Sequence, residues 1–148
     1  MAIRVGSETS RVSINLQGII LLHPYFWGED RIGSEGEHPW KSFVDGVWIF
    51  AYPGTSGLDD PLINPDKDPK VSDLGCSRVL VCVADKDILK DRGWYYKVIL
   101  GKNGWKGDIE VIEDKGENHA FFLLHPSSVN AGFQNVLLSS NFLISPAI

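Results

Sequence analysis

The feature that most constrains the fold of this chain is an unbroken apolar run at Val79–Ala84, which the acidic residues Asp85 and Asp87 follow. A strand that is apolar at every position must be covered on both faces, as the strands of parallel sheets are. Open parallel sheets bind their ligands outside the carboxyl ends of the strands. The run therefore predicts a buried parallel strand, with a candidate functional acid directly beyond its end.

The segments around this run continue the same pattern. Gln17–Tyr25 predicts a buried strand, and Asp108–Glu113 predicts a third strand. Ile88–Asn103 predicts a helix that ends at Gly104. Its core-facing residues are expected to be Leu89, Tyr96, Ile99 and Leu100. The order strand, helix, strand predicts right-handed crossovers on a parallel sheet with flanking helices, which is an α/β fold.

The stretch between the first two strands is expected to hold a loop at Glu29–Glu37, a helix that Pro39 opens, and a connecting loop at Gly54–Gly75. Apolar residues recur on one face of this helix: Trp40, Phe43, Val44, Val47, Trp48 and Ala51. We expect the stripe, with both tryptophans, to pack in the core or beneath a substrate cap rather than to form a ligand platform.

The carboxyl-terminal stretch and the composition indicate one globular domain over residues 1–148. Pro126–Phe142 predicts a closing helix whose inward side includes Val129 and Phe133. The 148 residues are 43% hydrophobic and 22% charged, which is typical of a soluble domain rather than a disordered chain.

Charge and hydropathy argue against several classes of partner. The chain has 14 basic and 19 acidic residues and a net charge of −5, with no basic cluster to bind nucleic acid. Apolar runs such as Gly18–Leu22 are far too short to cross a membrane. Cys76 and Cys82 fit buried, inert thiols, and the amino terminus shows no signal-peptide pattern. We therefore expect a cytoplasmic location.

Asp87 and His119 are the candidate catalytic residues. A buried acid beyond a strand can hold an imidazole in one tautomer and stabilise the imidazolium that forms when the ring accepts a proton. Each residue alone has a simpler interpretation, Asp87 as a helix N-cap and His119 as a structural or solvated loop residue. Asp85 competes for the role of the acid, and so does Asp91, which better complements the helix dipole.

A serine nucleophile cannot be found in this chain. In Gly54-Thr-Ser-Gly57 the second glycine stands one position too early for the G-x-S-x-G turn that presents such a serine, and the segment at Ser34 departs from it too. No His-Gly-Gly-Gly run is present to donate oxyanion hydrogen bonds. The pair at Asp87 and His119 therefore looks like a proton-handling couple without its alcohol.

No metal or cofactor is expected. His23 and His125 each precede a proline and look like strand or loop ends, and no H-x-H or H-E-x-x-H spacing is present. The acidic segment Asp59–Pro65 does not have the spacing of an EF-hand loop.

Several motifs distributed along the chain form a specific set. They are His23-Pro-Tyr-Phe-Trp-Gly28, Pro53-Gly-Thr-Ser-Gly-Leu-Asp-Asp-Pro-Leu-Ile-Asn-Pro65, Arg78-Val-Leu-Val-Cys-Val-Ala84, Asp91-Arg-Gly-Trp94 and Gly104-Trp-Lys-Gly107. Together they resemble the plant carboxylesterases of the hormone-sensitive-lipase-like branch of the α/β-hydrolases. The resemblance implies that the chain is the carboxyl-terminal part of such a fold, with about residues 29–75 forming a cap-supporting helix and loop insertion.

The resemblance also implies the roles of the candidate residues. Asp87 matches the family's triad acid and His119 its triad base, in an enzyme that hydrolyses small-molecule esters without a cofactor or metal. The serine and the oxyanion donors lie upstream in the family, and Met1 looks like an internal methionine. The chain alone is therefore expected to be inactive.

Two alternatives to an esterase remain open. The gibberellin receptors resemble these enzymes but lack the catalytic histidine, so a non-catalytic small-molecule binder is one alternative, against which His119 argues. The second is a dehydratase that uses the same scaffold on an isoflavonoid-like hydroxyl.

Overall fold

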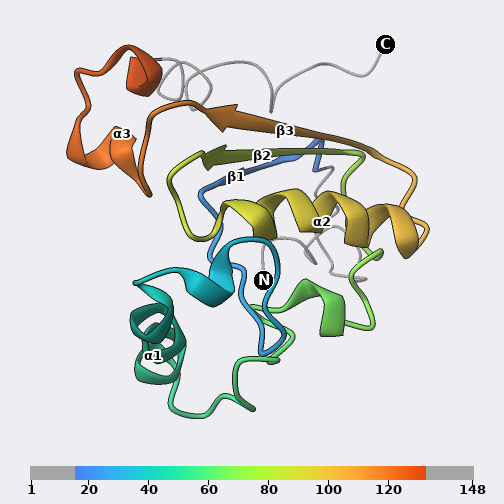
Figure 1. The fold of residues 1–148 in the computed structure, drawn as a ribbon. Coiled ribbons are helices and arrows are strands. Elements are labelled where there is room, and N and C mark those ends of the chain that lie inside the picture. The colour runs from blue at the N-terminus through green and yellow to red at the C-terminus, as the bar shows by residue number, and fades with distance from the viewer. Residues whose placement is uncertain (1–15, 133–148) are drawn as a thin grey trace.

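The computed structural model describes residues 16–132, which contain a three-stranded sheet (Figure 1). Its strands are β1 (Ile19–Leu22), β2 (Arg78–Ala84) and β3 (Asp108–Asp114), in the spatial order β1-β2-β3. Both pairings are parallel. The predicted α/β class is confirmed, and β2 and β3 lie within one residue of their predicted bounds.

Strand β2 is central and is buried at every position after its first residue. Its register pairs Cys82 with Leu22 of β1 and Ala84 with Asp114 of β3. Parallel pairing brings the carboxyl ends of the strands to one edge of the sheet. Residues that follow the strands, such as Asp87, are thereby gathered at this edge.

Helix α2 (Lys90–Lys102) covers one face of the sheet, as Figure 1 shows. Three of its predicted inward residues are at most 2% exposed and pack against the valines of β2: Tyr96, Ile99 and Leu100. Gly93 lies where the helix comes closest to the strand, since a Cβ there would stand 2.4 Å from Cγ1 of Val83. The absence of a side chain at Gly93 therefore allows the close packing of α2 on β2.

Strand β1 is shorter than the predicted Gln17–Tyr25 and half-buried instead of fully buried. It ends early because His23 adopts the left-handed φ of 46° and Pro24 has no backbone N–H to donate. Its burial is lower because, within residues 16–132, β1 has β2 as its single strand neighbour.

The stretch between β1 and β2 contains the short 3₁₀ helices η2 (Glu35–Glu37) and η3 (Pro65–Lys67) and the helix α1 (Lys41–Ala51). In Figure 1, α1 stands apart from the sheet, beyond the amino-terminal end of α2. A second apolar cluster joins this stretch to the turn before α2. Its buried members are Trp27, Val44, Ile63, Ile88 and Leu89.

A buried ion pair fastens the same stretch to α2. The guanidinium of Arg92 donates from Nε and Nη2 to the two carboxylate oxygens of Glu35, at 2.7 and 2.9 Å. Glu35 is 0% exposed and Arg92 is 5% exposed. Two charges can be buried here because each one is paired through two hydrogen bonds with the other.

Helix α1 begins at Lys41 rather than at Pro39. The expected burial of its apolar stripe is wrong for Trp40 and Phe43, which are 61% and 64% exposed. It is right for Val44, which is buried, while Trp48 is partly buried against the second apolar cluster. Burial differs along the stripe because, among the described residues, just one side of the helix packs against that cluster.

Beyond β3 the chain forms the short helix α3 (Phe121–Leu124). Of the predicted helix Pro126–Phe142, residues 129–132 are helical, and the part from Phe133 onward lies outside the described residues. Val129 is 93% exposed, so the expectation that it faces inward is wrong. Within residues 16–132, no helix combines the length and the apolar character needed to cross a membrane.

Candidate active site

Asp87 lies in the turn that connects β2 to α2, at the carboxyl edge of the sheet. Its backbone N–H donates to the carbonyl of Ala84 at 3.1 Å, and its carboxylate Oδ1 accepts the backbone N–H of Leu89 at 3.0 Å. The residue is 6% exposed. The interpretation of Asp87 as the helix N-cap is wrong, because the N-cap of α2 is Leu89; Oδ1 of Asp87 instead braces the turn before α2, and Oδ2 is left for another partner.

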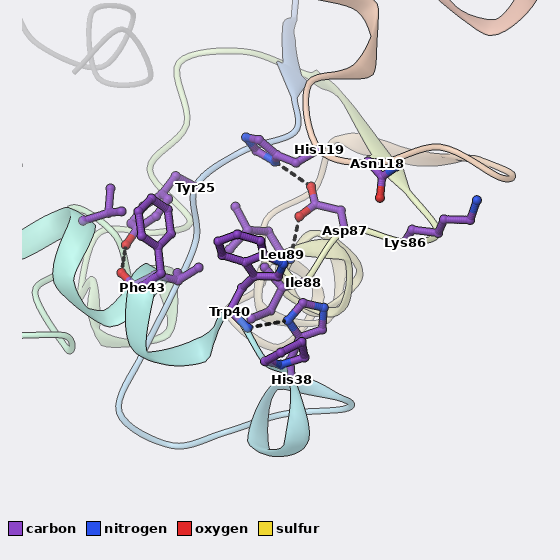
Figure 2. A pocket seen from close by; sticks show the side chains of 13 residues that line it. Tyr25, His38, Trp40, Phe43, Lys86, Asp87, Ile88, Leu89, Asn118 and His119 are labelled. Atoms are coloured by element: carbon purple, nitrogen blue, oxygen red, sulfur yellow. Dashed lines mark hydrogen bonds and ion pairs between the residues drawn. The ribbon is translucent and has the colours of Figure 1, made fainter. Parts of the chain in front are cut away.

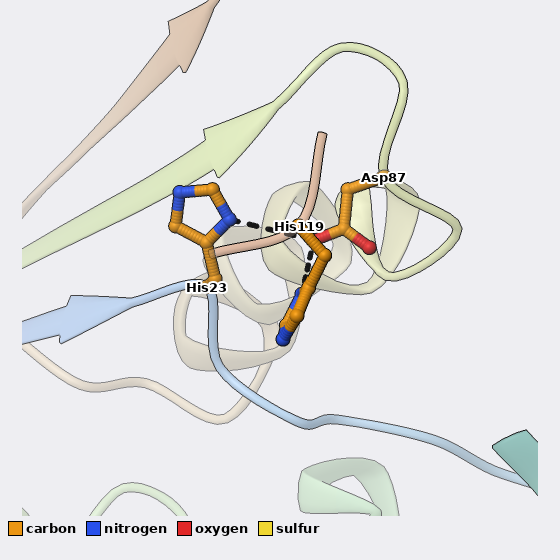
Figure 3. A group of neighbouring side chains, drawn as sticks. All are labelled: His23, Asp87 and His119. Atoms are coloured by element: carbon orange, nitrogen blue, oxygen red, sulfur yellow. Dashed lines mark hydrogen bonds and ion pairs between the residues drawn. The ribbon is translucent and has the colours of Figure 1, made fainter. Parts of the chain in front are cut away.

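His119 lies on the loop that follows β3 and supplies that partner. Its Nδ1 is 2.7 Å from Oδ2 of Asp87, and a dashed line in Figure 3 marks this contact. The side chain of Asp87 is 2% exposed, and that of His119 is 49% exposed. A carboxylate can only accept, so Nδ1 carries the proton and the lone pair of the neutral ring is on Nε2, away from Asp87.

The two groups stabilise each other's charged forms. Burial disfavours charge on Asp87, but hydrogen bonds from His119 and from the backbone N–H of Leu89 hold the pKa of Asp87 well below its usual range. The hydrogen bond to Asp87 raises the pKa of His119, against the opposing effect of burial. A ring held in this way can accept a proton at Nε2 while the carboxylate stabilises the imidazolium.

His23 is the residue at this site whose role the sequence did not reveal. Its side chain is 2% exposed, and its Nδ1 lies 3.5 Å from Oδ2 of Asp87. The same nitrogen accepts the backbone N–H of Ala120 at 3.2 Å. The signal was available, because His23 follows β1 directly at the same edge of the sheet at which Asp87 follows β2.

The two competing acids have other partners. Oδ1 of Asp85 accepts the backbone N–H of Gly116 at 2.8 Å, which braces the loop after β3. Oδ2 of Asp91 accepts from the backbone N–H and the hydroxyl of Ser34, at 2.9 and 3.2 Å. Asp87 is the acid that the structure brings to His119.

A cavity of about 480 Å³ opens beside the pair. Figure 2 shows the side chains that line it, among them Trp40 and Phe43 from the beginning of α1 and the pair Asp87 and His119. Trp40 and Phe43 stand edge to face, with ring centroids 5.8 Å apart. The residues around the cavity include Tyr25, His38, Trp40, Phe43, Val47, Ile88, Leu89 and Asn118, together with Asp87 and His119. The stripe that was expected in the core thus supplies a wall of the cavity.

The model of a protein family described as the α/β-hydrolase fold matches residues 1–123. The chain belongs to the α/β-hydrolase family. Similar curated proteins include probable carboxylesterase 2 of Arabidopsis thaliana, 43% identical over 123 residues, which cover 81% of this chain and 39% of that protein. Another is 2-hydroxyisoflavanone dehydratase of Glycyrrhiza echinata, 42% identical over 135 residues, which cover 88% of this chain and 41% of that protein. The resemblance to plant carboxylesterases is confirmed.

Solved structures support the fold of this α/β-hydrolase. Esterase LipW of Mycobacterium marinum superposes with a TM-score of 0.65 at 17% identity, over 82% of this chain and 38% of that one. The chain spans about two fifths of the length of the curated relatives described above.

One group of side chains in this α/β-hydrolase chain has the types of atom that bind metal ions, and these side chains take part in hydrogen bonds. Within the described part of the chain, His23, Asp87 and His119 are the group whose potential metal-ligand atoms lie within 4.8 Å of one another. In this group, Nδ1 of His119 contacts Oδ2 of Asp87, and Nδ1 of His23 accepts from the backbone N–H of Ala120. In the acidic segment, Asp60 accepts from the Thr55 hydroxyl at 2.8 Å and from the backbone N–H groups of Ser56 and Leu62, so it braces its loop.

Proposed function

We propose that this α/β-hydrolase chain supplies the acid and the base of a carboxylic ester hydrolase that acts on small-molecule esters. The observation that carries the proposal is the 2.7 Å contact between Oδ2 of Asp87 and Nδ1 of His119 at the carboxyl edge of a parallel sheet. Nε2 of His119 would take the proton of a serine hydroxyl as that oxygen attacks the ester carbonyl, and would return it to the leaving alcohol.

The cavity gives this chemistry a binding site of suitable character. Its α1 wall is apolar and aromatic, whereas the opposite side carries the acid and the base. Such a site would hold an apolar acyl or alcohol group beside the reacting carbonyl. We propose that residues 29–75 act as a cap-supporting insertion, with α1 as the wall of the substrate pocket.

The serine must come from sequence outside these 148 residues, which contain no G-x-S-x-G turn. We therefore propose that the chain alone does not hydrolyse esters. Incubation of the purified chain with a fluorophosphonate probe should leave it unlabelled, because phosphonylation of a serine with loss of fluoride requires an activated hydroxyl. Stoichiometric labelling would contradict the proposed division of the triad.

A chimera tests the proposed roles of Asp87 and His119. It joins the amino-terminal part of probable carboxylesterase 2, up to where this chain aligns, to residues 1–148. We expect the chimera to hydrolyse p-nitrophenyl butyrate and His119→Gln to lower its kcat by on the order of 10⁶. His125→Gln, at an exposed histidine nearby, is the matched control and should leave kcat unchanged. A His119→Gln chimera as fast as its parent would exclude the proposed base.

A dehydratase is the second candidate, because a dehydratase is 42% identical to this chain over 135 residues. In that reaction Nε2 of His119 would remove a proton from the carbon next to one that bears a hydroxyl and would return it to the hydroxyl oxygen, which leaves as water while the carbon–carbon double bond forms. A second chimera with the amino-terminal part of the dehydratase distinguishes the two. If the dehydratase chimera forms the dehydrated compound and the esterase chimera does not, the amino-terminal part of the enzyme decides which reaction takes place.

We also propose a cytoplasmic location for the complete protein. The names of similar proteins include chloroplastic forms from Tulipa gesneriana and a mitochondrial form from Arabidopsis thaliana. A carboxyl-terminal fluorescent tag on the full gene product would test this proposal, since signal in plastids or mitochondria would contradict it.

A further inference from the structure

We propose that His23 is a positioning residue for the pair formed by Asp87 and His119, and that its Nδ1 does this by fixing the peptide group that follows His119. The inference rests on the proposed function of the pair. It extends that function to a residue on a third element, the end of β1.

The backbone places His23 firmly at the edge of the sheet. Its N–H donates to the carbonyl of Cys82 at 2.9 Å, which extends the β1–β2 ladder by one residue. Its φ of 46° then turns the chain sharply away from the strand. A left-handed conformation is strained for histidine, and such strain persists where the surrounding structure holds it, often at a functional site.

The ring of His23 is enclosed by the loop that carries the base. Its centroid is 5.6 Å from that of His119, in an edge-to-face arrangement, and 5.6 and 5.5 Å from those of Phe121 and Phe122. Figure 3 shows the imidazoles of His23 and His119 converging on Asp87 from two different segments. The packing leaves the His23 side chain 2% exposed.

The hydrogen bond at Nδ1 identifies what His23 holds. The N–H of Ala120 belongs to the peptide group whose carbonyl is that of His119, and it donates to Nδ1 at 3.2 Å. Ala120 also has a left-handed φ, of 52°. The peptide between the base and α3 is thus held in an unfavourable conformation by a side chain from β1, 97 positions away.

The contact with Ala120 also indicates which ring nitrogen of His23 carries the proton. A backbone N–H can only donate, so Nδ1 of His23 bears the lone pair in this arrangement. A proton on Nδ1 would instead be donated to Oδ2 of Asp87, 3.5 Å away, and would compete with His119 for that oxygen. The shorter of the two contacts is the one with Ala120, so we assign the lone pair to Nδ1.

Two amide variants separate this role from simple space filling. The amide of His23→Asn can place an oxygen near the position of Nδ1, whereas the amide of His23→Gln lies one atom further out, near the position of Nε2. We expect the asparagine variant to keep the Ala120 bond and the glutamine variant to lose it. His125→Gln, at an exposed histidine, is the matched control.

The readout is nuclear magnetic resonance of His119 in the 148-residue chain, recorded as a function of pH. We expect the low-field Nδ1 proton signal and the raised protonation constant of His119 to persist in His23→Asn. In His23→Gln the signal should broaden or vanish and the protonation constant should fall by roughly tenfold. If His23→Gln does not fold, His23→Leu, which fills the space without an acceptor, replaces it.

Two results would overturn the inference. One is a folded His23→Gln or His23→Leu chain in which His119 titrates as in the parent. The other is an equal loss in His23→Asn and His23→Gln, which would indicate a requirement for the intact ring and not for the acceptor. Neither result depends on ester hydrolysis, so failure of the proposed function would be seen separately, in the chimera.

Discussion

His119 Nδ1 lies 2.7 Å from Asp87 Oδ2, although 32 positions separate the two residues in the sequence. The crossover through α2 and β3 brings them together, since parallel strands deliver their following loops to the same edge of the sheet. One partner is buried and the other is half-exposed. This asymmetry leaves about half of the His119 side chain accessible, as the proposed role in proton transfer requires.

Replacement of Asp87 by asparagine should lower the pKa of His119, because the hydrogen bond and the charge that raise it are lost. In the esterase chimera, the same change should lower kcat by roughly 10⁴, as the wrong tautomer of the ring becomes favoured. The pKa is measured by following the His119 ring signals with pH. Asp85→Asn, which alters a neighbouring carboxylate, is the control, and an unchanged His119 in Asp87→Asn would contradict the prediction.

The loss of stability caused by Asp87→Asn should depend on pH. The folded pKa of His119 is raised above 6.5, so its contribution is complete below about pH 6.5 and is lost as pH rises through the folded value. The folded pKa of Asp87 is lowered below 3.8, so its contribution is present above about pH 4 and is lost as pH falls through the folded value. Asp87→Asn should therefore cost more free energy of unfolding at pH 5.5 than at pH 8.5, measured in urea. A larger cost at pH 8.5 would reverse the assignment of the charges.

Glu35→Ala should lower the free energy of unfolding by about 3–5 kcal/mol, because it leaves the buried guanidinium of Arg92 unpaired. The double variant Glu35→Leu with Arg92→Leu should recover much of the loss, since no charge then remains buried. Urea unfolding of the three chains measures the effect. Lys115→Ala, which removes an exposed partner of Glu113, should be neutral. A double variant no more stable than Glu35→Ala would show that the ion pair is not the source of the cost.

Two glycines of α2 should respond to alanine with opposite signs. Gly93→Ala places a Cβ 2.4 Å from Cγ1 of Val83, and we expect it to destabilise the chain by about 1–3 kcal/mol. A Cβ at Gly101 meets no atom within 4 Å, so Gly101→Ala should stabilise the helix by about 0.5–1 kcal/mol. Thermal unfolding compares the two. The same sign for both variants would contradict the close packing at Gly93.

The two cysteines should resist alkylation while the chain is folded. Burial raises the pKa of the Cys82 thiol to about 12 and also raises that of Cys76. The reactive thiolate is therefore scarce and covered. With iodoacetamide at pH 8, labelling of the folded chain should be more than about a hundredfold slower than in urea. Equal rates would show that β2 is open to solvent.

Much of this fold could be predicted from the sequence because local patterns determine it. The continuous apolar run of β2 and the helical spacing of Tyr96, Ile99 and Leu100 each indicate burial without knowledge of any partner. The position of Asp87 at the carboxyl edge of the sheet could be predicted because the residue follows a strand. His119 could be predicted because its distance from Asp87 leaves room for one helix and one strand.

The remainder depends on contacts between distant segments. An apolar periodicity shows that α1 has an apolar face but does not show what covers it, so it leaves open whether Trp40 packs in the core or beneath a substrate cap. The left-handed backbone at His23 could not be predicted, because the position is not a glycine, the residue that usually indicates this conformation. Its partner Ala120 lies 97 positions away, so the place of His23 after a strand indicates the edge of the sheet but not this hydrogen bond.

The ion pair between Glu35 and Arg92 has a consequence for how substrate preference could diverge in this family. It attaches η2, which precedes α1 in the chain, to the helix that begins just after Asp87. Trp40 and Phe43 are then free to change in size and polarity while the geometry of proton transfer is retained.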